Sequence, residues 1–420
     1  MRRAQRPLHW PDDPGRRLAV TVMLPFAAGY FLSYLYRSIN AIVAPDLIAG
    51  FALSAADLGL LTSAFFLTFA AFQLPLGILL DRIGPRRTNG ALLLFAAAGA
   101  LVFATSESLS GLLVGRALIG FGMSACLMAS IKAVTIWFPL QRLPATTGWV
   151  MFAGGIGAMF ATVPVEFANQ IVGWRGVFAM AAGLTLLVSA ALFFVAPERA
   201  SAGRAESLGE QWRGVLRVLG SSVFWRVAAV SAVFQAVNMS IQGLWAGPWL
   251  SDVASYSRPA VAMSLLGFAA ATTAGFLFWG LVASRLATRG ITPLRLFKIG
   301  TTIFVLVQIP LALGITFGAW LCWVVFGLCG TAGSLVYTIL SRAFPVAMTG
   351  RANTALNMLV FLGAFLVQWA FGAVVSLWPP IEGHYHPDGY RAAFGAMVVL
   401  EAIALVWLLL AARLVEPARQ

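Results

Sequence analysis

Apolar segments long enough to cross a lipid bilayer recur twelve times along this 420-residue chain. A run of that length is typical of a transmembrane helix, because a helix satisfies its backbone hydrogen bonds internally. Only 10% of the residues are charged, whereas a soluble domain carries about 25%. The segments are approximately 18–44, 57–80, 89–106, 109–138, 146–169, 175–196, 222–250, 260–284, 294–316, 318–343, 351–377 and 391–412. We therefore predict an all-α membrane protein with twelve transmembrane helices.

The net charge of +13 follows from the predicted topology. With a cytoplasmic N-terminus, most of the 28 Lys and Arg residues fall in cytoplasmic segments, as the positive-inside pattern requires. We therefore predict a multi-pass protein of a bacterial inner (plasma) membrane with both termini cytoplasmic, and no nucleic-acid partner. The polar stretch 1–17 precedes an apolar run too long for a signal peptide, so no cleaved leader is expected.

Two halves of the chain repeat. The sequence Gly173-Trp-Arg175 recurs as Gly389-Tyr-Arg391, and Phe138-Pro139 recurs as Phe344-Pro345. Like helices thus occupy like places at an offset a little over 200 residues. The predicted organisation is a cytoplasmic N-terminal tail (1–17), an N-terminal six-helix bundle (18–196), a cytoplasmic linker with an interfacial helix (197–221), a C-terminal six-helix bundle (222–412) and a cytoplasmic tail (413–420).

A short charged turn, Gly77-Ile-Leu-Leu-Asp81-Arg82-Ile-Gly84-Pro85-Arg86-Arg87, joins the second and third segments. Gly84 permits a left-handed turn, and Pro85 suits the start of the next helix. A carboxylate held by nearby arginines suggests a gate. The alternative is that these charges only mark the cytoplasmic side.

The spacing of this turn resembles the loop between the second and third helices of the major facilitator superfamily, and the resemblance covers nearly the whole chain. It implies two pseudo-symmetric six-helix bundles with a substrate site at their midplane interface. In that superfamily the matching acid and arginines latch the halves together on the cytoplasmic side. The expected gating residues are Gly77, Asp81, Arg82, Gly84, Arg86 and Arg142.

Charges inside the apolar segments are rare, and each costs a few kcal/mol unless it is partnered. Arg37 in the first segment and Arg116 in the fourth are expected at similar depth. Two guanidiniums facing one space need an anion between them, or a carboxylate such as Glu166. An anionic substrate is the simplest partner. Lys132 either reaches the inner membrane surface or serves as an inner cavity cation.

Two further resemblances bear on these arginines. The sequence that starts at Arg116 resembles a fourth-helix motif of the superfamily, in which the arginine can simply bond carbonyls of the first helix. The spacing of Tyr34, Arg37 and Asn40 resembles the first helix of the anion:cation symporters, in which the matching arginine binds a substrate carboxylate. That family's usual acids are replaced here by Tyr36 and Met123, so its coupling chemistry does not transfer.

The fourth and fifth segments also resemble nitrate/nitrite porter relatives, in Trp137-Phe138-Pro139 and in Gly154, Gly155 and Gly157. The second and eighth segments lack the arginines that those porters carry, which disfavours nitrate itself. The same glycines are expected to let helices cross closely.

The C-terminal half offers uncharged polar groups that suit an organic solute. The candidate substrate contacts are Gln235, Asn238, Gln242 and Trp245 in the seventh segment and Asn357 and Gln368 in the eleventh. The alternative for each amide is a hydrogen bond between helices.

Coupling to protons needs a titratable group in the path. Glu166 is the first candidate and Glu401 the second, although Glu401 lies in a helix expected outside the cavity, where it could be a packing residue. No catalytic cluster, cofactor motif or metal site is evident, so an enzyme is not expected. We predict a monomeric secondary transporter of a small organic anion, coupled to protons or another ion. The alternatives are a transporter of neutral or zwitterionic solutes such as peptides or drugs, and a solute sensor that does not transport.

Overall fold

The computed structural model describes residues 18–139, 142–197, 207–287, 289–344, 346–381 and 383–411. These residues are almost entirely helical, and the described part contains no β-strand. The predicted tails 1–17 and 413–420, and residues 198–206 of the predicted linker, lie outside the described residues.

The N-terminal half comprises η1 (Ala19–Met23), α2 (Leu24–Ser38), α3 (Asn40–Phe51), α4 (Ala55–Arg82), α5 (Pro85–Thr105), α6 (Leu109–Met123), α7 (Cys126–Trp137), α8 (Leu143–Phe160) and α9 (Val163–Phe194). The linker helix α10 (Leu208–Leu219) leads into the C-terminal half. That half comprises α11 (Ser222–Ser240), η3 (Ile241–Trp245), α12 (Ala246–Asp252), α13 (Arg258–Ala287), α14 (Pro293–Ala312), α15 (Ala319–Gly330), η4 (Thr331–Ser334), α16 (Leu335–Ala343), α17 (Val346–Val375) and α18 (Pro387–Ala411).

Helices make up most of each predicted membrane-spanning segment. Eleven described helices are long and apolar enough to cross a membrane, and the shorter apolar helices Asn40–Phe51 and Ala145–Phe160 accompany them. The fifth predicted segment ends within the first part of α9, and the sixth forms the rest of α9. Helix α9 continues across a kink at Gly173, whose φ is +68°. The prediction of a twelve-helix, all-α membrane fold is confirmed.

Local sequence explains where the helices begin and end. Ser54 and Asp57 form a reciprocal capping box at the start of α4. Gly84 has a φ of +90°, and Pro85 begins α5, as the sequence predicts for the charged turn. In the repeat, Phe138 and Phe344 occupy the same position, each ending an inner helix in an extended conformation.

Four spanning segments are interrupted near their middle. The first breaks at Ile39 between α2 and α3, and the fourth at Ser124 and Ala125 between α6 and α7. The seventh contains the π-helical turn η3, and the tenth contains the 3-10 turn η4. Interrupted helices near the midplane are where transporters commonly build substrate sites.

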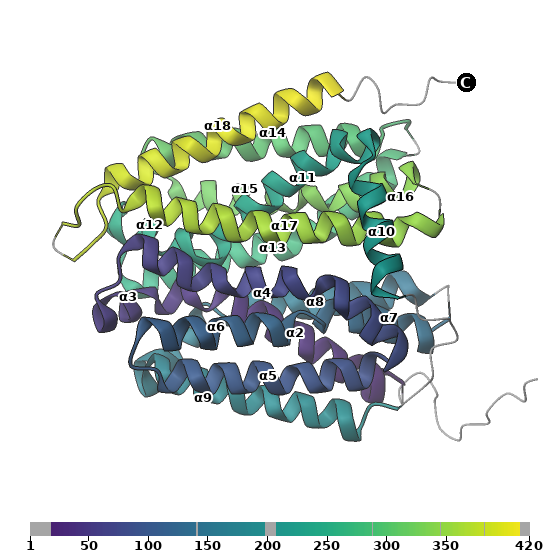
Figure 1. Ribbon diagram of the computed structural model, residues 1–420. Coiled ribbons are helices and arrows are strands. Elements are labelled where there is room, and N and C mark those ends of the chain that lie inside the picture. Colours follow the sequence, from purple (N-terminus) through teal and green to yellow (C-terminus); the bar gives the residue numbers. More distant parts are fainter. Residues whose placement is uncertain are drawn as a thin grey trace, which may run out of the picture.

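The two halves lie side by side, with purple and blue helices in one group and green and yellow helices in the other (Figure 1). Helices α4 and α17 run next to each other where the groups meet, and α10 packs on both of them. Following the predicted orientation, we call the end that carries Asp81 the inner end and the opposite end, at α3 and α12, the outer end.

Glycines bring the two backbones into contact at the outer end. A Cβ atom on Gly372 of α17 would lie 2.2 Å from the carbonyl oxygen of Ala55, and one on Gly247 of α12 would lie 2.2 Å from that of Ala41. The Tyr385 hydroxyl donates to the Leu53 carbonyl at 3.0 Å, which adds a further contact between the halves. The outer end is therefore closed in this structure.

Replacing Gly372 with Val should open the outer end, because its side chain cannot fit against the Ala55 carbonyl. The distance between spin labels on the exposed outer-end residues Ser110 and Thr316 should lengthen. The native cysteines would first be replaced by alanine. Gly183→Val, on an exposed face where a Cβ meets nothing within 4 Å, should leave the distance unchanged. An unchanged distance in Gly372→Val would contradict the role given to this glycine.

Candidate functional site

Arg37 lies at the interface between the halves, surrounded by aromatic rings. Its guanidinium carbon is 4.6 Å from the ring centroid of Tyr34, 5.8 Å from that of Phe69 and 5.2 Å from that of Phe361. Phe69 of α4 and Phe361 of α17 stack across the interface with centroids 4.0 Å apart. Among the described residues no carboxylate forms an ion pair with Arg37, and its buried Nε atom has no hydrogen-bond partner. Within the described residues, the guanidinium is therefore contacted by aromatic rings and not by a carboxylate.

A row of polar side chains lies one helical turn nearer the inner end. The Asn357 amide donates to Gln73 Oε1 at 3.3 Å, and the Tyr337 hydroxyl donates to Asn357 Oδ1 at 3.3 Å. Gln73 follows Phe69 by four residues, and Asn357 precedes Phe361 by four, so this row lies about 6 Å along the helices from the arginine. Asn357, a predicted contact, is thus beside Arg37.

Arg116 does not share the surroundings of Arg37. It is fully buried, donates to the Tyr36 carbonyl at 2.7 Å and lies 5.3 Å from the ring of Phe65. The expected common space between the two guanidiniums is not found, because Arg116 points into the packing of α6 against α2 and α4. Asn40 is similarly occupied, since its amide donates to Thr62 Oγ1 at 2.9 Å. A substrate role for either residue stays a prediction.

The charged inner turn makes its described contacts within one half. Asp81 forms an ion pair with Lys132 of α7, and Arg86 donates to the Phe193 carbonyl of α9. Arg82 and Arg142 are exposed. Lys132 is therefore neither a lone cavity cation nor directed only at the membrane surface, because the carboxylate of Asp81 holds it. In this conformation no described contact shows Asp81 latching the two halves together, so its gating role stays a prediction.

The predicted polar contacts of the C-terminal half are mostly engaged in helix packing. Gln235 donates to Ser231 Oγ on its own helix at 2.7 Å, and Asn238 packs against the backbone of α15. Trp245 is fully buried and donates to the Gln368 carbonyl at 3.1 Å. Gln242 lines a small cavity between the halves and approaches Thr272 Oγ1 at 3.4 Å.

Gln368 differs from these amides. It is fully buried at the interface, and neither of its side-chain polar atoms has a hydrogen-bond partner. A buried amide without partners is costly, and among the predicted substrate contacts Gln368 is the one with both polar atoms unpartnered in the described structure.

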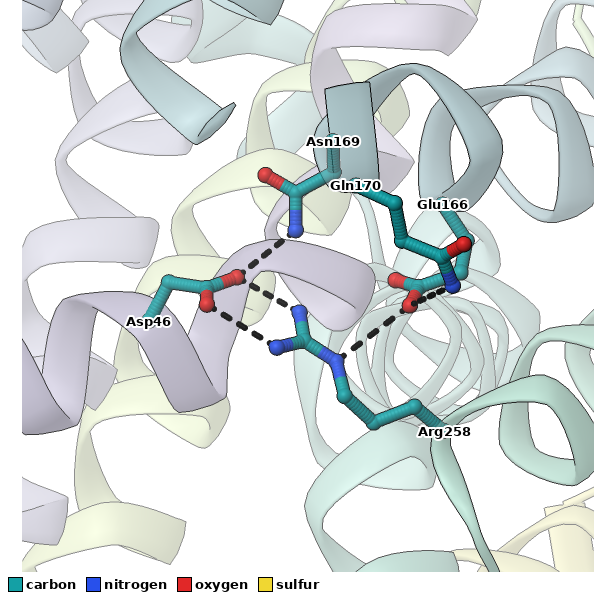
Figure 2. Close-up of polar contacts among 5 residues, drawn as sticks. All are labelled: Asp46, Glu166, Asn169, Gln170 and Arg258. Carbon is teal, nitrogen blue, oxygen red and sulfur yellow. Dashed lines mark hydrogen bonds and ion pairs between the residues drawn. The ribbon is translucent and has the colours of Figure 1, made fainter. Parts of the chain in front are cut away.

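The two candidate proton carriers lie far from one another. Glu401 is fully buried between α18 and α14, where Gln308 donates to it. Glu166 lies near the outer end of α9 and pairs with Arg258 at 3.3 Å (Figure 2). The alternative in which Glu166 pairs with Arg37 is not what the structure has, because Arg258 takes that carboxylate. Sequence inspection did not single out Arg258 or its second partner Asp46, since residues 212 apart show no pairing signal.

The outer loop before α18 is anchored to the end of α12. The ring of His384 is 2.8 Å from an Asp252 carboxylate oxygen, and the Tyr390 hydroxyl donates to the other oxygen at 2.7 Å. Within the described residues, no group of three or more His, Cys, Asp and Glu side chains could hold a metal ion. Glu382, next to this loop's histidines, lies outside the described residues.

The sequence profile of the Major Facilitator Superfamily matches residues 26–368, which is most of the chain. This chain belongs to the Major Facilitator Superfamily. The fold agrees, since a bacterial homolog of the human lysosomal transporter Spinster, in an inward-facing and occupied conformation, superposes with a TM-score of 0.77. That comparison covers 96% of this chain and 98% of the other at 19% identity, so it shows the fold alone. The family and fold are those of membrane transporters.

Curated relatives match in part. The chain is 27% identical over 163 residues to a probable L-galactonate transporter of Escherichia coli (strain K12), covering 39% of this chain and 36% of the relative. It is 24% identical over 238 residues to the nitrate/nitrite transporter NrtP of Picosynechococcus sp. (strain ATCC 27264 / PCC 7002 / PR-6), covering 50% and 44%. The matches span less than half of the length of these superfamily relatives.

The two intramembrane arginines should respond differently to replacement. Arg116→Ala removes a charged hydrogen bond to a buried carbonyl and should lower the free energy of unfolding by about 2 kcal/mol. Arg37→Ala loses ring contacts but also removes an unpaired charge, so its effect should stay within about 1 kcal/mol. Thermal unfolding of both purified variants in detergent measures this. A larger loss in Arg37→Ala than in Arg116→Ala would reverse the two assignments.

Proposed function

We propose that this chain moves a small organic anion across the membrane by alternating access and that Arg37 binds the charged group of that anion. The observation that carries the proposal is the Arg37 guanidinium, which lies among three rings at the interface between the halves without a paired carboxylate in the described chain. An unpaired cation at that depth costs at least a few kcal/mol. A carboxylate or sulfonate would supply charge-assisted hydrogen bonds to it.

The groups around Arg37 favour an anion that also carries hydroxyl groups. The rings of Tyr34 and Phe361 can pack against a carbon skeleton, while the amides of Gln73 and Asn357 can bond hydroxyls. The Escherichia coli relative is named a probable L-galactonate transporter, and galactonate is such a polyhydroxy acid. A sugar acid is therefore our first candidate. Nitrate, named for the other relative, carries no hydroxyl and no carbon skeleton to fill this site.

We further propose a monomer in a bacterial inner membrane, with both termini cytoplasmic and transport coupled to protons. Alternating access suits a fold of two six-helix bundles with the site at their interface. Coupling requires that the driving ion bind the two conformations unequally. A sensor of the same fold would bind the anion without moving it, and a flux assay separates the two functions.

Binding can be tested by thermal stabilisation of the purified protein with sugar acids, sulfonates, nitrate, dipeptides and neutral sugars. An organic anion at a hundredfold excess over its Kd should stabilise the wild type by about 2.7 kcal/mol. Arg37→Ala should lose this response. Arg37→Lys should bind the anion more weakly, because an ammonium cannot form the bidentate hydrogen bonds that a guanidinium forms with a carboxylate. Arg391→Gln is the matched control, since Arg391 pairs with Asp388 within the first turns of α18.

Stabilisation of the wild type and of Arg37→Ala alike by neutral or zwitterionic compounds alone would overturn the anion proposal. If an organic anion does stabilise the wild type, its uptake into proteoliposomes separates transport from sensing. Uptake should be faster when the outer solution is acidic.

A further inference from the structure

A three-residue ion cluster joins the halves at the outer end (Figure 2). Arg258, at the start of α13, donates to both carboxylate oxygens of Asp46 on α3, at 3.0 and 2.6 Å. Its Nε atom is 3.3 Å from Glu166 Oε1 on α9. The arginine comes from the C-terminal half and both acids from the N-terminal half, so any separation of the halves at this end must break the cluster.

The three charges do not balance. Two carboxylates share one guanidinium, so the cluster carries a net charge of −1 when both acids are ionised. If the halves separate, Arg258 moves away with α13, while Asp46 and Glu166 remain close together on α3 and α9. Glu166 is only 6% exposed, so the departure of Arg258 leaves a buried charge uncompensated there, which is unfavourable, whereas Asp46 is 26% exposed and partly solvated. The separated state therefore needs another cation at the two acids.

We infer that Asp46, Glu166 and Arg258 form the outer gate of the protein and that Glu166 binds a proton from the outer solution when Arg258 leaves. Arg258 and the proton then alternate at one pair of carboxylates. The arginine neutralises the pair in the closed state, and the proton neutralises it in the open state.

Glu166 suits the proton better than Asp46 for two reasons. Its side chain is only 6% exposed against 26% for Asp46, so its charged form is the costlier one to leave in place. Asp46 also keeps a second donor on its own half, because the Asn169 amide donates to it at 2.8 Å. Glu166 keeps a donor on its own helix as well, because the Gln170 amide donates to it at 3.2 Å, but Gln170 is exposed to solvent whereas Asn169 is buried.

The other charged side chains on the elements packed against α9 do not lie in this cluster. They are Arg37 of α2, Arg175 of α9 itself, Arg86 and Arg87 at the inner end of α5, and Arg285 at the inner end of α13. Arg175 donates to the carbonyls of Ala104 and Ser106, and Arg37 is enclosed by rings. Within the described residues, Arg258 is thus the basic group that faces Glu166.

The direction of the pH effect follows from linkage. The open state holds one more proton than the closed state, so lowering the outer pH favours opening. One proton changes the ratio of open to closed molecules by at most about tenfold per pH unit.

The gate can be tested without any substrate, so the result is independent of the anion proposal. The readout is the distance between spin labels at Ser110 and Thr316, measured by pulsed electron paramagnetic resonance in nanodiscs at pH 7.5 and pH 5. Alanine would first replace the native cysteines. The wild type should show mainly the short distance at pH 7.5 and a larger population at the longer distance at pH 5. Arg258→Gln should show the longer distance at both values.

Glu166→Gln imitates the protonated acid and should show a longer population that no longer responds to pH. Arg391→Gln breaks an ion pair with Asp388 within the C-terminal half and should behave as the wild type. The exchange of Asp46→Arg with Arg258→Asp should restore the short distance lost in Arg258→Gln, which guards against a variant that simply folds poorly. A short distance in Arg258→Gln would overturn the gate, and a preserved pH response in Glu166→Gln would overturn the proton site.

Discussion

The Arg37 guanidinium, which no carboxylate pairs with in the described part of the chain, is the constraint on which the proposed function depends. Lipid-spanning helices tolerate a cation only when something nearby compensates it. Here aromatic rings from both halves surround the guanidinium, and Phe69 and Phe361 stack across the interface beside it. Rings stabilise a cation less than a carboxylate does. This arrangement is the basis of our proposal that an anion binds at the point where the two halves meet.

The two ends of the molecule use charge differently. At the outer end, Arg258 bridges acids of the opposite half, and glycines such as Gly372 let the backbones touch. At the inner end, the described ion pair of Asp81 is with Lys132 in the same half. Closure of the outer end thus depends on contacts that separate when the halves move, whereas the inner turn can stay intact. Alternating access requires that the two ends of such a fold open at different times.

Much of the fold could be predicted from the sequence, because uncharged runs of membrane length leave few alternatives to helices. The linker helix and the turn at Gly84 were also readable, since local patterns determine them. Contacts between the two halves could not be predicted from the sequence. Asp46 and Arg258 are 212 residues apart, and no local pattern pairs them. The motif at Arg116 left open a bond to a carbonyl of the first helix, and the packing of α6 against α2 shows that bond with the Tyr36 carbonyl.

The most direct test of the central claim is a structure of the protein with a bound sugar acid. We expect the carboxylate to lie within hydrogen-bonding distance of the Arg37 guanidinium, beside Phe361, with hydroxyl groups toward Asn357. An acid bound elsewhere, with Arg37 still surrounded only by rings, would contradict the account.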